Sequence, residues 1–226
     1  MEILITGADR PLGRRAAEHL GPRHGLRPVG RSPAEEAGAG PDYTRADLRS
    51  PEQVEPLVRG ADAVLHLTEF DPAPLSGSNA EQRLLERATL GAYTLCVEAR
   101  EAGVERVVVA GSLRIFDSYP SSCLIDEQWR PRPDANARSL APYLAELAVR
   151  EFAREGPLCG VCLRFLPIGE DPERNTRPED ALAALDRALD LELGPPGYRW
   201  HVFHVARSGR FITRQARLIL GFDPGS

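Results

Sequence analysis

Two glycines close to the N-terminus, Gly7 and Gly13, stand where a phosphate-binding turn could form. They lie between a short apolar run over residues 2–6, which predicts a strand, and a helical pattern over residues 12–20. Gly7 permits a tight turn, and Gly13 allows the helix to pack closely against the strand. The N-terminus of such a helix offers free N–H groups and the positive end of its dipole to a pyrophosphate. The turn therefore predicts a dinucleotide site, and an ordinary strand-to-helix connection is the alternative.

Two arginines near this turn bear on which dinucleotide would fit. Arg31 follows the second predicted strand, residues 26–30, and Arg10 lies on the glycine turn itself. A guanidinium binds a ribose 2′-phosphate bidentately, whereas an acidic residue at this place would bind the ribose hydroxyls and repel that phosphate. We therefore expect NADP to be preferred over NAD if a dinucleotide binds. In the alternative interpretation both arginines are solvated surface charges.

The elements that would position these residues alternate along the chain. Apolar runs predict strands over residues 2–6, 26–30, 43–46, 63–67, 104–110, 158–166 and 198–205. Helical patterns lie between and after them, over residues 12–20, from Ser50 onward, and over residues 79–102, 139–155, 178–191 and 210–220. Ser50 is expected to cap its helix, with Pro51 in the first helical position and Gln53 reaching back, and Gly103 to end the next one. Alternating strands and helices with right-handed crossovers predict an α/β fold, a Rossmann-type doubly wound parallel sheet.

Composition and charge exclude several classes of protein. The 226 residues suit one domain with at most a small appendage, and 42% hydrophobic residues exclude a disordered chain. A net charge of −5 argues against a nucleic-acid partner, and no apolar run reaches the roughly 18–20 residues that cross a membrane. The chain shows no secretory signal, and its four cysteines do not suggest a disulfide scaffold, so a cytoplasmic location is expected. All 28 basic residues are arginine.

Six segments together resemble the short-chain dehydrogenases/reductases, in the extended or atypical branch that holds epimerases, dehydratases and uronate dehydrogenases. Three of them lie in the first part of the chain: the TGxxxxxG turn (residues 6–13), an Asp-Leu pair that lies beside the adenine in this family (47–48), and a strand that ends at the cofactor (62–67). The other three are the passage to the catalytic serine (98–112), an LRxxP segment (163–167), and a terminal strand and helix (203–222). The resemblance implies an NAD(P)-binding oxidoreductase that acts on a small sugar-like or hydroxy/carbonyl substrate. The cofactor-binding residues that it adds to Arg10 and Arg31 are Gly7, Leu12, Gly13, Asp47, Leu48, Leu67 and Tyr143.

In this family a serine and a tyrosine hydrogen-bond the reacting group, and a lysine four residues after the tyrosine lowers the pKa of the phenol. Ser112 matches the serine and Tyr143 the tyrosine, but Leu147 occupies the lysine position and the chain contains no lysine. Arg150 shares a predicted helix face with Tyr143, yet arginine effectively never gives up its proton. A phenol is a poor base at neutral pH without a nearby cation. The resemblance therefore implies impaired or unconventional catalysis, and the alternative is a non-catalytic sensor or interaction protein that binds a nucleotide.

The resemblance also implies a division of the chain. Residues 1–166 correspond to the NAD(P)-binding domain and residues 167–226 to a reduced C-terminal lobe, which is too short to enclose a large nucleotide-sugar. Because the lobe is short, a small substrate is expected. Pro11, within the glycine turn, departs from the family because it has no N–H to offer a phosphate.

Two further expectations concern metals and partners. Cys159 and Cys162 lie three residues apart on a predicted strand, so their side chains point to opposite faces and no metal site is expected. The helices over residues 79–102 and 139–155 carry apolar residues on more than one side, which a single core-facing stripe does not need. By analogy with the family, these helices predict a homodimer.

Overall fold

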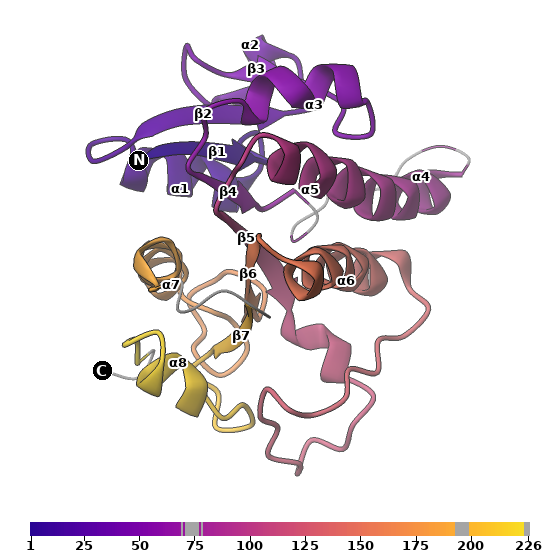
Figure 1. Cartoon of the computed structure of the whole chain (residues 1–226). Helices are drawn as coiled ribbons and strands as arrows, with labels where there is room; N and C mark the ends of the chain where they lie inside the picture. The colour runs from indigo at the N-terminus through magenta and orange to yellow at the C-terminus, as the bar shows by residue number, and fades with distance from the viewer. Residues whose placement is uncertain (69, 71–76, 78, 193–198, 224–226) are drawn as a thin grey trace.

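Seven parallel strands form one sheet at the centre of the computed structural model, which describes residues 1–68, 70, 77, 79–192 and 199–223 (Figure 1). The strands are β1 (Glu2–Thr6), β2 (Gly25–Gly30), β3 (Thr44–Arg45), β4 (Ala63–His66), β5 (Arg106–Ser112), β6 (Cys159–Phe165) and β7 (Trp200–Val205). Their order across the sheet is β3-β2-β1-β4-β5-β6-β7. The order reverses between β1 and β4, which confirms the predicted doubly wound topology.

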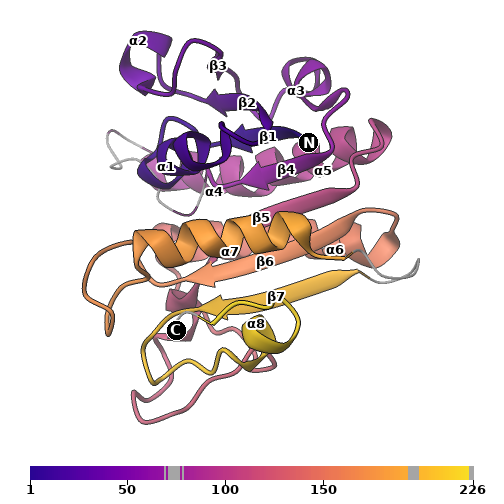
Figure 2. The same cartoon turned by 90° about the vertical axis from the view of Figure 1, so that its left-hand side faces the viewer.

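Helices cover both faces of the sheet (Figures 1 and 2). One face carries α1 (Pro11–Leu20) and α7 (Pro178–Asp190), which pack beside each other. The other face carries α3 (Pro51–Val58), α5 (Ala92–Glu101) and α6 (Ala137–Glu155). A short helix, α2 (Ala34–Ala37), lies between β2 and β3. Within the described part of the chain, no helix has both the length and the apolar character to span a bilayer.

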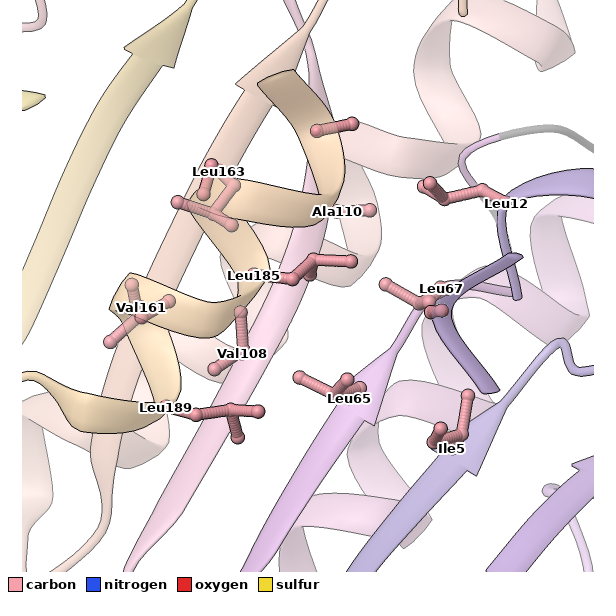
Figure 3. Packing of buried hydrophobic residues seen from close by; sticks show 14 of the residues in the cluster. Ile5, Leu12, Leu65, Leu67, Val108, Ala110, Val161, Leu163, Leu185 and Leu189 are labelled. Atoms are coloured by element: carbon pink, nitrogen blue, oxygen red, sulfur yellow. The ribbon is translucent and has the colours of Figure 1, made fainter. Parts of the chain in front are cut away.

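Each face of the sheet has its own hydrophobic core. Leu65 of β4 and Val108 of β5 point toward α1 and α7, where Leu12 and Leu185 meet them (Figure 3). Val64, the neighbour of Leu65, belongs to the core on the opposite face. Successive side chains of a strand point to opposite faces, and here both faces are buried. This double burial explains why the strands read as continuous apolar runs.

The helical pattern over residues 79–102 corresponds to one helical path with an irregular turn. α4 (Ala80–Glu86) continues into a π-helical turn (Arg87–Gly91) and then into α5. The path ends, as predicted, at Gly103, which has a φ of +76°. A glycine adopts this left-handed conformation without a steric cost.

Two local predictions hold only in part. α3 begins as predicted, with Ser50 at the N-cap position and Pro51 as its first residue, but the Ser50 side chain makes no capping hydrogen bond. Its hydroxyl donates to Glu52 Oε2 (2.8 Å), and Gln53 reaches back so that its Oε1 accepts from the backbone N–H of Asp47 (2.9 Å). The helix expected over residues 210–220 is reduced to α8 (Arg214–Leu218). Phe211 forms a β-bridge with Ile125 in the preceding stretch, so the backbone there is already hydrogen-bonded in an extended form.

The segment after residue 166 completes the main sheet. β7 pairs with β6 along its length. The domain boundary predicted at residue 166 therefore lies between two neighbouring strands of the same sheet. Arg106, the first residue of β5, donates to the carbonyl oxygens of Ala188 (2.8 Å) and Leu189 at the C-terminal end of α7. A cation at this end complements the helix dipole and satisfies carbonyls that the helix leaves unpaired.

Candidate functional site

The carboxyl ends of β1, β4 and β5 meet where the strand order reverses. Thr6 of β1 lies beside His66 of β4, and His66 lies beside Val109 of β5. In open α/β sheets, ligands bind in the crevice outside the carboxyl ends of the strands at this point. The loops that follow these three strands therefore define the candidate site.

The turn between β1 and α1 has no room for side chains at its two glycines. Gly7 has a φ of +77°, and a Cβ there would lie 2.8 Å from Cα of Thr68. A Cβ on Gly13 would lie 2.1 Å from the carbonyl oxygen of Gly7. Pro11 is the first residue of α1, where the missing N–H costs no helical hydrogen bond. The predicted tight turn and close packing of helix on strand are confirmed, and Pro11 fits the start of the helix.

Asp9 ties the glycine turn to the loop after β2. Its Oδ2 accepts hydrogen bonds from the backbone N–H groups of Arg31 (3.2 Å) and Ser32 (3.0 Å) and from the Ser32 hydroxyl (2.8 Å). Burial alone would raise the pKa of Asp9, but the hydrogen bonds from Ser32 and Arg31 outweigh it and hold the pKa below its usual value. Asp9 is therefore ionised at neutral pH and fixes the backbone of Arg31 beside the turn. Sequence reasoning missed this role, because an aspartate in a turn has an ordinary local explanation.

A small pocket lies beside this loop, and four of the predicted cofactor residues line it together. They are Gly7, Arg31, Asp47 and Leu48. The rest of the described wall comes from Thr6, Val29, Gly30, Ala46, Arg49, Thr68 and Arg87. The pocket joins the glycine turn to the carboxyl end of β2, which is the path that the adenosine half of a dinucleotide takes across a doubly wound sheet. We call it the adenosine pocket.

A second hollow adjoins the adenosine pocket, and arginines dominate its wall. This arginine hollow is lined by Ala46, Asp47 and Gln53 and by five arginines: Arg31, Arg45, Arg49, Arg83 and Arg87. Asp47 is already matched, because both its carboxylate oxygens accept hydrogen bonds from Arg49, and that contact lowers the pKa of Asp47. Arg31 and Arg45 bring further guanidiniums to the same wall.

Sequence reasoning foresaw only one of these five arginines. Arg45 comes from β3, and Arg83 and Arg87 come from α4 and the π-helical turn, so only the folded chain brings them beside Arg31. Arg10, which was predicted to form a clamp with Arg31, lines neither the adenosine pocket nor the arginine hollow. The structure thus keeps Arg31 at the expected place and surrounds it with different partners.

Ser112 lies at the end of β5, in a cleft of about 330 Å³ that we call the Ser112 cleft. Its described lining is Pro11, Leu12, Arg15, Phe70, Ser112, Arg114, Arg138, Pro167 and Ile168. Ser112 Oγ accepts a hydrogen bond from the backbone N–H of Arg114 (3.2 Å) and thereby caps a short 3-10 turn (Leu113–Phe116). The hydroxyl hydrogen of Ser112 remains available to a ligand.

Tyr143, which was predicted to act with Ser112, is not among the described residues that line the Ser112 cleft. It packs against the cluster around Leu113 and Phe116, and Leu113 is the residue after Ser112. The residue of α6 that lines the cleft is Arg138, in the first turn of the helix. Five residues along an α-helix correspond to a rotation of about 140°, so Arg138 and Tyr143 point in different directions. The structure brings Ser112 and Leu12 together in this cleft, and the action of Tyr143 with Ser112 stays a prediction.

Leu147, which occupies the lysine position of the family, and Arg150, the other residue considered as a cation near Tyr143, both lie on the outside of the molecule. Leu147 lines a shallow groove between α5 and α6, together with Tyr93 and Phe152. Arg150 is partly exposed and pairs with Glu151 at 2.8 Å. Neither residue lines the Ser112 cleft.

The remaining predicted residue, Leu67, is buried behind the glycine turn, and its backbone N–H donates to the carbonyl oxygen of Thr6 (3.2 Å). Next to it, Thr68 Oγ1 donates to Thr6 Oγ1 (3.0 Å), which lies 2.8 Å from His66 Nδ1. Burial lowers the pKa of His66 to about 4, so this ring is neutral at pH 7. These contacts make the end of β4 a rigid support for the turn.

The buried cysteines belong to β6 rather than to the site. Cys159 and Cys162 are both inside the core, and Cys162 Sγ donates to Glu146 Oε2 (3.3 Å). In the part of the chain that the structure describes, no three His, Cys, Asp or Glu side chains gather into a group that could hold a metal ion.

Comparisons with known proteins agree with this geometry. The family model described as the NAD dependent epimerase/dehydratase family matches residues 3–200. Uronate dehydrogenases from Pseudomonas syringae pv. tomato and Pseudomonas putida are 31% and 30% identical to the chain over 158 and 156 residues. Each match covers 68% of this chain, and the chain spans about half the length of these relatives, 55% and 56%.

Solved structures of similar fold include a mutant uronate dehydrogenase from Agrobacterium tumefaciens complexed with NAD, with a TM-score of 0.82 and 23% identity over 100% of this chain and 84% of that one. Another is MoeE5 in complex with UDP-glucuronic acid and NAD, with a TM-score of 0.78 and 19% identity over 98% of this chain and 93% of that one. The structural likeness supports the Rossmann-type fold, and the family model covers most of the sequence. The chain therefore belongs to the NAD dependent epimerase/dehydratase family.

Proposed function

We propose that this chain binds a nicotinamide adenine dinucleotide and works as an oxidoreductase-type protein on a small sugar-like or hydroxy/carbonyl substrate. The observation that carries this proposal is the glycine turn: neither Gly7 nor Gly13 has room for a Cβ, and the turn opens onto the adenosine pocket. Gly7, Leu12 and Gly13 would hold the pyrophosphate, and Asp47 and Leu48 would lie beside the adenine. The bound dinucleotide would supply hydride transfer. The names of the similar dehydrogenases support a sugar-like substrate.

We further propose that NADP(H) is preferred over NAD(H). The arginine hollow adjoins the adenosine pocket and shares Arg31 with it. A 2′-phosphate on the adenosine ribose would carry negative charge toward guanidiniums that bind phosphate bidentately. Asp47, which would otherwise repel this phosphate, is neutralised by Arg49. In this preference the chain would differ from the similar structures that were solved with NAD.

Equilibrium titration with NADPH and NADH, followed by cofactor fluorescence, tests both proposals. We expect NADPH to bind at least about tenfold more tightly, and Arg31→Asp to reverse the order by removing a charge-assisted contact worth about 1.5–3 kcal/mol. Arg130→Asp, which changes an exposed arginine on another loop, is the matched control. Binding of neither cofactor would overturn the first proposal, and equal affinities in the wild type would overturn the second.

A non-catalytic sensor is the second candidate function, and one observation favours it. Tyr143 lies outside the Ser112 cleft, so the described residues give Ser112 no phenol as a partner. A protein of this kind would bind the dinucleotide as a ligand without turning it over. Cofactor binding combined with no change in nicotinamide absorbance across a panel of aldoses, uronates and hydroxy acids would support the sensor.

We propose that two copies pair through α5 and α6. Tyr93 is 55% exposed and Leu90 is 48% exposed. Tyr93 shares a groove with Leu147 and Phe152, and charged residues border it. Light scattering at tens of micromolar protein should give the mass of a dimer, and Tyr93→Arg should shift it toward the monomer. A monomer mass for the wild type would exclude this assembly.

We also propose a cytoplasmic location. All four cysteines are free thiols, and three of them are buried. A reducing compartment keeps such thiols unpaired.

A further inference from the structure

We propose that three side chains, those of Asp9, Tyr43 and Arg45, are positioning residues of the adenosine pocket. They hold the backbone of Arg31 and Ser32 in one conformation and thereby set the preference of the chain for NADP(H) over NAD(H). The inference deepens the proposed function and rests on it, because it assigns that preference to residues behind Arg31.

The backbone of Arg31 and Ser32 is bound by side chains. The two residues lie between β2 and α2, and within the described part of the chain neither makes a backbone–backbone hydrogen bond. Asp9 Oδ2 accepts from the N–H groups of Arg31 (3.2 Å) and Ser32 (3.0 Å). Arg45 Nε donates to the carbonyl oxygen of Arg31 (3.0 Å), and the Tyr43 hydroxyl donates to that of Ser32 (2.9 Å). Every backbone donor and acceptor of this short loop therefore has a side-chain partner.

The partners come from both sides of β2. Asp9 belongs to the turn after β1, Tyr43 directly precedes β3, and β1 and β3 are the two neighbours of β2 in the sheet. Asp9 and Tyr43 approach each other over Gly30, where a Cβ would lie 2.3 Å from Asp9 Oδ1 and 2.7 Å from the Tyr43 hydroxyl oxygen. Contacts from two directions oppose movement of the loop toward either neighbouring strand.

Tyr43 is a constant donor in this arrangement. Its side chain is 9% exposed and belongs to the core on the side of α1 and α7. Burial and the negative charge of Asp9 raise the pKa of Tyr43 to about 12, so the phenol keeps its proton at neutral pH. The packed ring fixes the place of its hydroxyl group, and the hydroxyl group fixes the Ser32 carbonyl.

These contacts act on a ligand through Arg31. Arg31 lines both the adenosine pocket and the arginine hollow, whereas Asp9 and Tyr43 are not among the described residues that line either. A side chain that binds a ligand loses freedom, and a backbone already held in place reduces that loss. A 2′-phosphate needs the Arg31 guanidinium in one position, but ribose hydroxyls do not. Loosening the loop should therefore weaken NADPH binding more than NADH binding.

Tyr43→Phe tests this expectation, because it removes the hydroxyl group and keeps the ring. Tyr119→Phe is the matched control: the Tyr119 hydroxyl also donates to a backbone carbonyl oxygen, that of Arg130 (2.9 Å), in another loop. In equilibrium titrations we expect Tyr43→Phe to weaken NADPH binding about fivefold and NADH binding by less than about twofold, and the control to change neither. Equal losses for the two cofactors would show a merely structural role and overturn the inference.

Two fragments assign the effect to the adenosine half of the cofactor. Adenosine 2′,5′-bisphosphate carries the 2′-phosphate, and adenosine 5′-phosphate lacks it. In calorimetric titrations we expect Tyr43→Phe to weaken the bisphosphate about fivefold and the monophosphate by less than about twofold. Unchanged binding of the bisphosphate would contradict the assignment.

Asp9→Asn separates positioning from charge. Removing a negative charge beside the pocket would by itself favour a phosphate, so an electrostatic role of Asp9 predicts tighter NADPH binding in this variant. The positioning role predicts the opposite, a loss of about threefold or more, because an amide accepts hydrogen bonds less strongly than a carboxylate. Tighter NADPH binding in Asp9→Asn would overturn the role of Asp9.

Amide hydrogen exchange, followed by NMR of the chain without cofactor, tests the positioning directly. The amides of Arg31 and Ser32 should exchange about fivefold or more faster in Tyr43→Phe and in Asp9→Asn, and at the wild-type rate in Tyr119→Phe. Unchanged exchange in both of the first two variants would show that these side chains do not hold the loop.

Failure of this inference and failure of the proposed function give different results. A wild type that prefers NADPH, with the preference intact in Tyr43→Phe and in Asp9→Asn, would overturn this inference alone. A wild type that binds NADPH and NADH equally, or binds neither, would overturn the proposed function, and this inference with it, since no preference would remain for the loop to set.

Discussion

Glu146 of α6 and Arg164 of β6 form an ion pair inside the protein. Arg164 Nη2 lies 2.6 Å from Glu146 Oε1 and Arg164 Nε lies 3.1 Å from Oε2, and the two side chains are 5% and 4% exposed. Around the axis of α6, Glu146 lies between the directions of Arg138 and Tyr143. The pair therefore joins α6 to β6 inside the core, beside the buried residues Ala145 and Val149 of the same helix.

Removing one partner of this pair should be strongly destabilising. Glu146→Gln leaves the buried guanidinium of Arg164 without its counter-charge, and we expect a loss of about 3–5 kcal/mol in the free energy of unfolding, measured by urea denaturation. Glu151→Gln breaks only exposed pairs on the same helix and should have little effect. Similar small effects for both variants would show that the buried pair does not hold α6 in place.

The glycine turn makes a steric prediction. In Gly13→Ala the new methyl group would meet the carbonyl oxygen of Gly7, so the helix must move away from the strand. We expect a loss of about 1–3 kcal/mol in stability together with loss of NADPH binding. Gly209→Ala, where a Cβ would meet no atom within 4 Å, is the matched control. Unchanged cofactor affinity in Gly13→Ala would separate the turn from the proposed site.

The order of elements was predictable from sequence because it depends on local patterns. Apolar runs such as residues 63–67 and the glycine turn follow from burial on both faces and from backbone conformation, and both were confirmed. The side-chain hydrogen bonds at the start of α3 were not predictable, because Gln53 accepts from the backbone N–H of Asp47, which belongs to the loop before the helix. Local signals do not distinguish two hydrogen bonds of similar strength.

The site was predictable only in part. Gly7, Arg31, Asp47 and Leu48 meet in one pocket because the carboxyl ends of neighbouring strands meet. The rotation of α6 about its axis could not be read from a motif. A match at Tyr143 does not show which side of the helix faces the sheet, where Glu146 pairs with Arg164. Arg138 lies in the first turn of α6, one residue before the predicted start of this helix at Ser139, and its sequence context carried no signal that it would line the Ser112 cleft.

Burial of His66 makes stability depend on pH. Its pKa is lowered to about 4 in the folded chain, against about 6.5 in an unfolded one. Between these values the unfolded chain binds a proton that the folded chain does not, so stability is fully present above pH 6.5 and falls as the pH drops toward 4. The contribution amounts to about 3 kcal/mol. His66→Asn should remove this part of the pH dependence in urea unfolding at pH 4.5 to 7.5, and an unchanged slope would contradict it.

A lysine at position 147 should not create activity. Leu147 lies in the outer groove between α5 and α6, away from the Ser112 cleft, so an ammonium group there cannot act on a group held by Ser112. We expect Leu147→Lys to show no more oxidation of NADPH with aldoses or hydroxy-carbonyl compounds than the wild type shows. Tyr143→Phe should also leave this rate unchanged. A rate that rises in the first variant or falls in the second would place Tyr143 in the chemistry.

The most direct measurement is a crystal structure of the chain grown with NADPH. We expect the pyrophosphate to lie against the turn of Gly7 and Gly13, the adenosine to occupy its pocket with the 2′-phosphate facing Arg31, and the nicotinamide end to point toward the Ser112 cleft. A dinucleotide bound elsewhere, or a 2′-phosphate that makes no contact with Arg31 or the arginine hollow, would contradict it.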